Sequence, residues 1–177
     1  MKSLSIPTLA AAVALTMAMP ASADTFVFKT SLAGAGEPVP TSLATGMATV
    51  TFDDALNSVG VTMSFSGLAN SSPFGHIHCC TAVPGTGSAG VAVAFNALPA
   101  ATSGTYNDTF VLAASAFTSL LTGTQAGTAY VNIHTPGTYA AGEIRGFLAP
   151  VPEPATSALM LGGLGVMVWV AKRRRQT

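Results

Sequence analysis

Charged side chains are scarce in this sequence of 177 residues: they make up 8% of it, against about a quarter in an ordinary soluble domain. Between Asp24 and Pro150 the only basic residues are Lys29 and Arg145, because the other five lie near the two ends of the chain. Six acidic residues share that stretch, so its net charge is −4. Nucleic-acid binding needs a basic surface, and this composition excludes that class of partner.

Signatures of common enzyme sites are also missing. The sequence has no nucleophile elbow, HExxH helix, P-loop or pair of carboxylates at a catalytic spacing. Asp53-Asp54 is followed by Ala55-Leu56-Asn57, which is typical of a turn between two strands. We therefore assign no catalytic residue and expect no enzymatic activity, with a metal-dependent activity as the alternative.

Residues 1–23 have the pattern of a secretory signal peptide. Lys2 precedes an apolar run, which is followed by Pro20 and the small residues Ala21-Ser22-Ala23. This order predicts removal by signal peptidase and a mature N-terminus at Asp24. The alternative is a permanent anchor, but the run is short for a hydrocarbon core of about 30 Å and a proline interrupts it.

Residues 151–177 form a second targeting segment. Pro152-Glu153-Pro154 is followed by an uncharged run over residues 155–171, and then by Lys172-Arg173-Arg174-Arg175. The run is at the lower limit of about 17 residues for a transmembrane helix. The basic end would stay in the cytoplasm, which predicts a C-terminal apolar helix with the preceding domain outside the cell.

These three features in this order resemble the PEP-CTERM sorting signal of Gram-negative bacteria. The resemblance implies that an exosortase recognises the tripeptide, removes the tail and releases the protein to the cell surface or extracellular matrix. It also implies two partners, the exosortase and, before processing, the cytoplasmic membrane. Extracellular polysaccharide is a third candidate partner, since the signal often occurs in cells that make exopolysaccharide. The alternative is a permanent single-span anchor.

Export places the two cysteines of the chain, Cys79 and Cys80, in an oxidising compartment. The only intramolecular disulfide they can form joins neighbours. Adjacent side chains on a strand point to opposite faces, so such a bridge needs a distorted turn. A vicinal disulfide is our first prediction, and the alternatives are thiolate ligands of a metal and an intermolecular disulfide.

The segment between the targeting signals, residues 24–150, predicts an all-β domain. It is rich in Thr, Val, Ala, Gly and Phe, and turn signals recur about every ten residues, as in an antiparallel Greek-key sandwich or barrel. One short helix is expected over residues 115–121, because Phe117, Leu120 and Leu121 share a stripe. The strand candidates are residues 25–30, 48–52, 59–65, 129–134 and 143–148, with weaker ones at 90–95 and 109–112.

Three short segments each place two polar side chains on one strand face. His76 and His78 flank Ile77, and because side chains alternate along a strand the two imidazoles share a face. The same spacing relates Asn132 to His134 and Glu143 to Arg145. If these strands pair, they form a single polar cluster of His76, His78, Asn132, His134, Glu143 and Arg145.

Four motifs in chain order resemble the CHRD domain, which is named after chordin and occurs in many microbial secreted proteins. They are a leading segment with Leu32, Gly34, Glu37 and Pro38, the His-Ile-His segment, Tyr-Val-Asn-Ile-His-Thr at 130–135 and Gly-Glu-Ile-Arg-Gly at 142–146. The resemblance covers residues 26–148. It implies an all-β sandwich and brings no settled activity in microbes.

His76, His78 and His134 are the only histidines and form a candidate site for Zn or Cu, with water in the fourth position. The His-x-His strand is similar to that of copper-zinc superoxide dismutase. That enzyme needs more ligating residues than this chain contains, so we do not expect dismutase activity. The alternative, which the sequence favours, is a structural network in which Asn and His bond backbone groups while Glu143 and Arg145 form ion pairs.

The sequence therefore predicts a non-enzymatic binding or structural module at the cell surface. The alternative is a metal-binding or redox protein that uses the histidines and cysteines.

Overall fold

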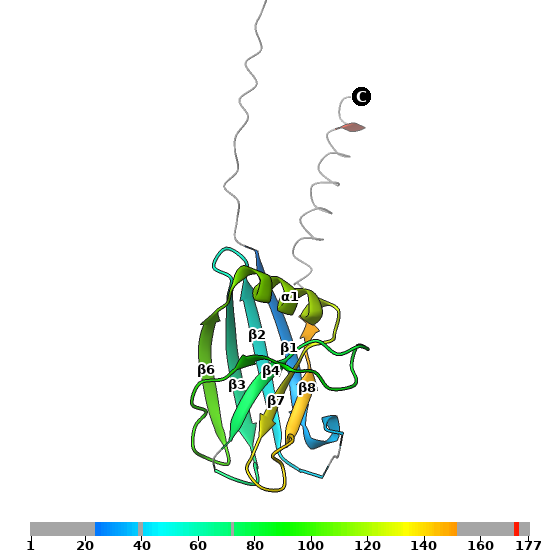
Figure 1. The fold of residues 1–177 in the computed structure, drawn as a ribbon. Coiled ribbons are helices and arrows are strands. Elements are labelled where there is room, and N and C mark those ends of the chain that lie inside the picture. The colour runs from blue at the N-terminus through cyan, green and yellow to red at the C-terminus, as the bar shows by residue number, and fades with distance from the viewer. Residues whose placement is uncertain (1–23, 39–40, 72, 152–171, 174–177) are drawn as a thin grey trace, which may run out of the picture.

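The computed structural model describes residues 24–38, 41–71, 73–151 and 172–173, and the regular structure in these residues is mostly antiparallel β-strand (Figure 1). The strands join into one sheet that curves into a nearly closed barrel, in the order β5-β4-β7-β8-β1-β2-β3-β6, with β9 beside β1. The all-β prediction is confirmed. In chain order the elements are β1 (Thr25–Ala33), the 3-10 turn η1 (Gly34–Gly36), β2 (Thr45–Asp53), β3 (Ser58–Ser66), β4 (Phe74–His78), β5 (Val91–Ala94), β6 (Gly104–Val111), α1 (Ala114–Gln125), β7 (Tyr130–His134), β8 (Ile144–Phe147) and β9 (Ala149–Pro150).

Alternation along the strands builds the core inside the barrel. In β3, Val59 and Val61 are fully buried while Thr62 is exposed. Phe52 of β2 lies at the centre: its ring meets Phe28 edge-on at 5.6 Å and the ring of Phe117 from α1 at 5.8 Å. Helix α1 therefore covers one end of the barrel with the stripe that the sequence predicted.

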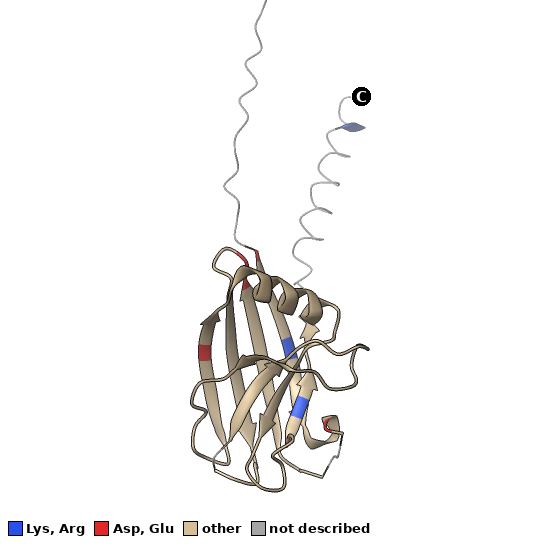
Figure 2. Ribbon diagram, in the orientation of Figure 1, with Lys and Arg blue, Asp and Glu red and all other residues tan. Residues whose placement is uncertain are grey.

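The adjacent residues Asp53 and Asp54 lie at the turn between β2 and β3, where both carboxylates accept hydrogen bonds from backbone amides. The Asp53 carboxylate accepts a hydrogen bond from the amide of Leu56 at 3.1 Å, and Asp54 accepts one from the amide of Asp24 at 2.9 Å. Asn57 has a φ of 49°, in the left-handed region that Asn tolerates. Asp53 thus stabilises the turn itself, as expected, and Asp54 ties the turn to the residue before β1. Figure 2 shows how thinly the charged residues are spread over the fold.

Two predicted boundaries differ most from the structure. Strand β6 begins at Gly104, five residues before the predicted start at 109, because β3 pairs with it along its whole length from Phe65 to Ser58. Asn107 and Asp108 have low strand propensity, and the partner strand overrides that preference. Helix α1 also runs to Gln125 instead of 121. Its last turn is packed against the fold, since Gly123 and Thr124 are buried, and it ends before Gly127, whose φ is 70°.

Side chains close the barrel where the backbone does not. No ladder joins the edge strands β5 and β6 in the described residues. Instead Asn96 donates to the Asp108 carboxylate at 2.9 Å, and the Phe95 ring lies 5.4 Å from the ring of Tyr106. Burial, followed by the hydrogen bond to Asp108, raises the pKa of Tyr106 to about 12. The seam is therefore held by polar and aromatic side-chain contacts.

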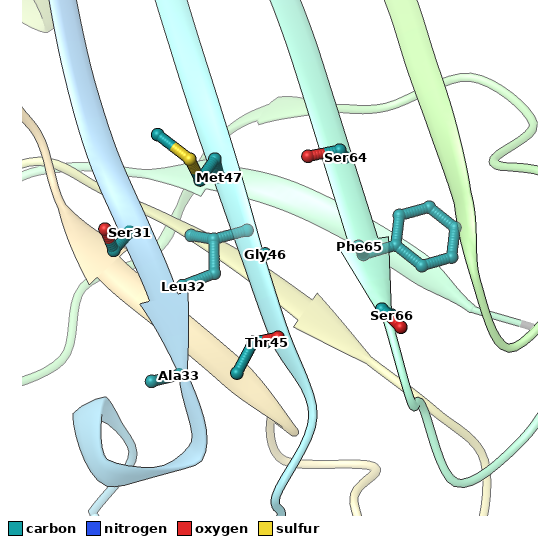
Figure 3. A pocket seen from close by; sticks show the side chains of 9 residues that line it. All are labelled: Ser31, Leu32, Ala33, Thr45, Gly46, Met47, Ser64, Phe65 and Ser66. Atoms are coloured by element: carbon teal, nitrogen blue, oxygen red, sulfur yellow. The ribbon is translucent and has the colours of Figure 1, made fainter.

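A surface hollow of about 490 Å³ lies over the ends of β1, β2 and β3 (Figure 3). None of its lining residues is titratable, so it offers no acid or base. They are Ser31, Leu32, Ala33, Thr45, Gly46, Met47, Ser64, Phe65 and Ser66.

We predict that Phe52→Ala lowers the free energy of unfolding by about 3–5 kcal/mol, because it leaves a cavity among packed rings. The matched control is Leu56→Ala: Leu56 is 64% exposed, and a change there should cost no more than about 0.5 kcal/mol. Urea titration of both variants measures the difference. Equal losses would mean that the core is not centred on Phe52.

Candidate metal centre

The three neighbouring strands β4, β7 and β8 carry the candidate site on one face. In the ladder, His76 stands opposite Asn132, and Asn132 stands opposite Arg145. On the other face Ile77 and Ile133 are fully buried in the core. The alternation that the sequence indicated thus produces a core face and a polar face in the same strands.

The structure brings the three histidines together on that polar face. His76 Nδ1 lies 3.3 Å from His134 Nε2, and one ring nitrogen from each histidine lies within 4.8 Å of the other two. The reason is topological, since β7 is the direct neighbour of β4. His134 pairs with Phe74, two residues before His76 on β4, so His76 and His134 are diagonal neighbours on the same face.

Backbone carbonyls fix the tautomers of two imidazoles. His78 Nδ1 lies 2.9 Å from the Ala89 carbonyl oxygen, and His134 Nδ1 lies 3.1 Å from that of Ala140. A carbonyl can only accept, so both Nδ1 atoms carry the proton and both Nε2 atoms present a lone pair. Metal-bound histidines are held in the same way, with the second ring nitrogen donating to a carbonyl or carboxylate.

His78 Nε2 is buried and has no hydrogen-bond partner. Leaving a buried polar atom unpaired costs about 1–3 kcal/mol, so native proteins rarely do so without a function for the atom. In the described residues one further buried side-chain atom is unpaired, Asn132 Oδ1, and it belongs to the same polar face. The unpaired atoms of the fold are therefore concentrated at the histidine group.

Aromatic rings hold the imidazole planes. Phe74 stacks on His134 with centroids 4.9 Å apart and an interplanar angle of 3°. Tyr130 stacks on His78 at 4.8 Å and 4°. Sequence analysis did not single out Phe74, whereas Tyr130 belongs to a segment that resembles the CHRD pattern. Their positions in the strands, two residues from His76 and from Asn132 respectively, were the available signal, since such residues share a face.

Burial lowers the pKa of all three imidazoles. For His134 the pKa falls to about 4, with the neighbouring His76 and His78 adding to the effect of burial. Burial and His78 lower the pKa of His76, and burial and the Arg145 charge lower that of His78. The three rings are thus neutral at pH 7, and the neutral form is the one that binds metal.

Arg145 clamps two loops over this face. Its Nε donates to the Gly36 carbonyl and its Nη1 to the Gly87 carbonyl, the latter at 3.0 Å. Glu37 lies beside it, with Oε2 at 4.0 Å from Nε, and accepts a hydrogen bond of 2.7 Å from Asn132 Nδ2. Burial raises the pKa of Glu37 despite the Arg145 charge. The ion-pair partner of Arg145 is therefore Glu37, which the sequence offered only as part of the CHRD pattern.

Glu143 forms a separate buried group and is not joined to Arg145. Its Oε1 accepts from the Ser42 hydroxyl at 2.9 Å and the Ala69 amide at 2.8 Å, and its Oε2 accepts from the Thr135 hydroxyl. These bonds tie the loops after η1 and β3 to the end of β7. Glu143, one of the six residues expected in a single cluster, therefore lies outside that cluster and stabilises the neighbouring loops.

Cys79 and Cys80 are joined to each other in the structure, across a cis peptide bond. This is the first of the three arrangements that the sequence allowed. Their sulfur atoms pack on Gly123 of α1, where a Cβ would collide with both, and border a pocket of about 190 Å³ beside Leu120. The candidate metal ligands are three histidines, and neither cysteine is among them.

Comparison with known families agrees with these observations. A model of the CHRD domain matches residues 28–148. The chain belongs to the CHRD domain family. The match starts two residues later than the resemblance predicted, and ends where it was expected. No curated protein and no solved structure matches the chain.

The PEP-CTERM protein-sorting motif matches residues 150–175, directly after the CHRD domain. This CHRD protein is thus an exported protein that carries an exosortase-type sorting signal. Most of the tail lies outside the described residues, as does the predicted signal peptide: the residues concerned are 1–23, 152–171 and 174–177. Within the described part of the chain, no helix has the length and apolar character needed to cross a bilayer.

We predict that acid destabilises the metal-free protein through His134. Its pKa is near 6.5 when unfolded and about 4 when folded, so the unfolded chain binds more protons between these values. The free energy of unfolding is therefore unaffected by protonation of His134 above pH 6.5 and falls as the pH drops toward 4. The total loss is at most about 3 kcal/mol.

Urea midpoints measured in chelator from pH 4 to 7 check this. The variant His134→Gln serves as the reference, because Glu37 and Asp108 contribute equally to both proteins. The wild-type protein should lose more stability over this range than the variant. Parallel curves would show that His134 titrates normally.

Proposed function

We propose that this CHRD protein is a surface module that an exosortase-type system sorts, and that its β-domain binds one zinc or copper ion through His76, His78 and His134. The observation that carries the proposal is the buried lone pair of His78 Nε2, which has no partner within a group of three convergent imidazoles. A metal ion would satisfy that atom and the other two donors at once.

The spacing of two donors supports the proposal. Imidazole nitrogens bind zinc at about 2.0–2.1 Å in a tetrahedral arrangement, which separates two such nitrogens by about 3.3 Å. His76 Nδ1 and His134 Nε2 are 3.3 Å apart. The third donor is close to this pair, since one ring nitrogen from each of the three histidines lies within 4.8 Å of the other two.

The alternative is a hydrogen bond from His76 Nδ1 to His134 Nε2 within a purely structural network. A separation of 3.3 Å is long for such a bond, whose usual range ends near about 3.2 Å. It would also leave His78 Nε2 unpaired. Because the network accounts for two donors and the metal for three, the geometry favours the metal over the structural role that the sequence favoured.

The donor set supports the choice of metal. Imidazole suits zinc and copper, whereas magnesium and calcium prefer carboxylate and carbonyl oxygen. The group contains three histidines and no carboxylate or thiolate. Neither the CHRD domain nor the PEP-CTERM motif is an enzyme family, which fits a domain without catalytic activity.

We predict that protein purified without added metal contains about one equivalent of zinc or copper, measured by elemental analysis. His78→Asn removes a donor and should weaken affinity more than about 100-fold, beyond what loss of a supporting contact costs. The double variant Cys79→Ser/Cys80→Ser is the control and should bind as the wild type does.

The outcome that contradicts the proposal is a metal-free protein that also fails to bind zinc or copper in titration at pH 7. Equal affinity of the wild type and His78→Asn would likewise exclude the histidine site. Loss of binding in the cysteine variant would move the site to the thiolates.

We also predict that the tail is removed during sorting. Mass spectrometry of the surface-exposed protein should find a C-terminus near Pro152, without the peptide that contains Trp169. A Glu153→Ala variant, which alters the tripeptide, should retain that peptide. Intact tails on most of the wild-type surface protein would instead support a permanent anchor.

A further inference from the structure

We infer that the metal of the His76, His78 and His134 site keeps one coordination position facing solvent, and that this position binds a small anion. The inference rests on the proposed function and adds the chemical class of the ligand. It follows from the number of donors, from the charge that they leave on the ion, and from the uneven exposure of the site.

The number of protein donors is three. The group of ligating side chains consists of three histidines, and no Cys, Asp or Glu of the described residues joins it. Structural zinc sites are closed by four protein ligands, whereas sites with three leave a position for water or another ligand. The composition of the group thus matches the open class.

The charge on the ion is not compensated by the protein. Imidazole binds a metal ion in its neutral form, so the three ligands supply no negative charge. The two buried carboxylates nearby are already engaged: Glu37 by Asn132 and Arg145, and Glu143 by three donors of its own. A divalent ion here would keep its full double charge in a poorly solvated place, which favours an anionic ligand from solution.

The open position faces the His76 side. His78 and His134 are each 8% exposed and lie under loops that supply the carbonyls of Ala89 and Ala140, while His76 is only half-buried. Phe74, which stacks on His134, is 41% exposed at the same edge. The approach is therefore limited to one side and flanked by an aromatic ring, so the ligand is small.

Cobalt(II) is a suitable probe, because it replaces zinc and its visible absorption reports the ligands. The chelator-treated full-length protein is loaded with one equivalent of Co²⁺ and titrated with sodium azide. We expect a single saturating change in the absorption bands, reversed by dialysis. A metal-bound water should also titrate with a pKa near about 7, which azide abolishes.

The outcomes separate this inference from the proposed function. If Co²⁺ does not bind, the metal site itself is wrong. If Co²⁺ binds and its spectrum ignores both azide and pH, the site is closed and the inference is overturned. The variant His76→Asn is the control for adventitious metal: an azide response of wild-type size in that variant would also overturn it.

Discussion

The antiparallel pairing of β4 with β7 is the contact on which the candidate site depends. Its register places His76 opposite Asn132, so that His134, two residues further along β7, is the diagonal neighbour of His76. A slip by one residue would bring the imidazoles into the core and expose Ile77. That exchange is prevented by burial, because Ile77, Val131 and Ile133 are all fully buried on the opposite face. The hydrophobic core thus fixes the position of the polar group without touching it.

The second layer of the site comes from loops that cover the polar face. Arg145 holds the carbonyls of Gly36 and Gly87, and the loop that follows Gly87 supplies the Ala89 carbonyl that orients His78. The same cover removes water from the rings, which lowers their pKa and keeps them neutral. Burial of a polar face is costly, and here it produces three neutral imidazoles, of which His78 and His134 are oriented by backbone carbonyls.

Much of the fold and of the candidate site could be predicted from the sequence, and the parts that could not be predicted have physical reasons. The two-residue period of His76 and His78 was sufficient to place both rings on one face, and β3 could be read from its alternation. Glu37 could not be matched to Arg145, because a salt bridge between residues so far apart depends on the fold. Carbonyls such as that of Ala140 have no side-chain signature at all. The start of β6 was missed because its pairing with β3 outweighs the polar composition of the strand.

The central claim is that three imidazoles, brought together by strand pairing, form the metal site. X-ray absorption at the edge of the metal bound by the purified protein tests it most directly. The account predicts three imidazole nitrogens at about 2.0–2.1 Å and one light atom from solvent, with no sulfur. A sulfur shell at about 2.3 Å, or a coordination sphere without imidazole, would contradict it.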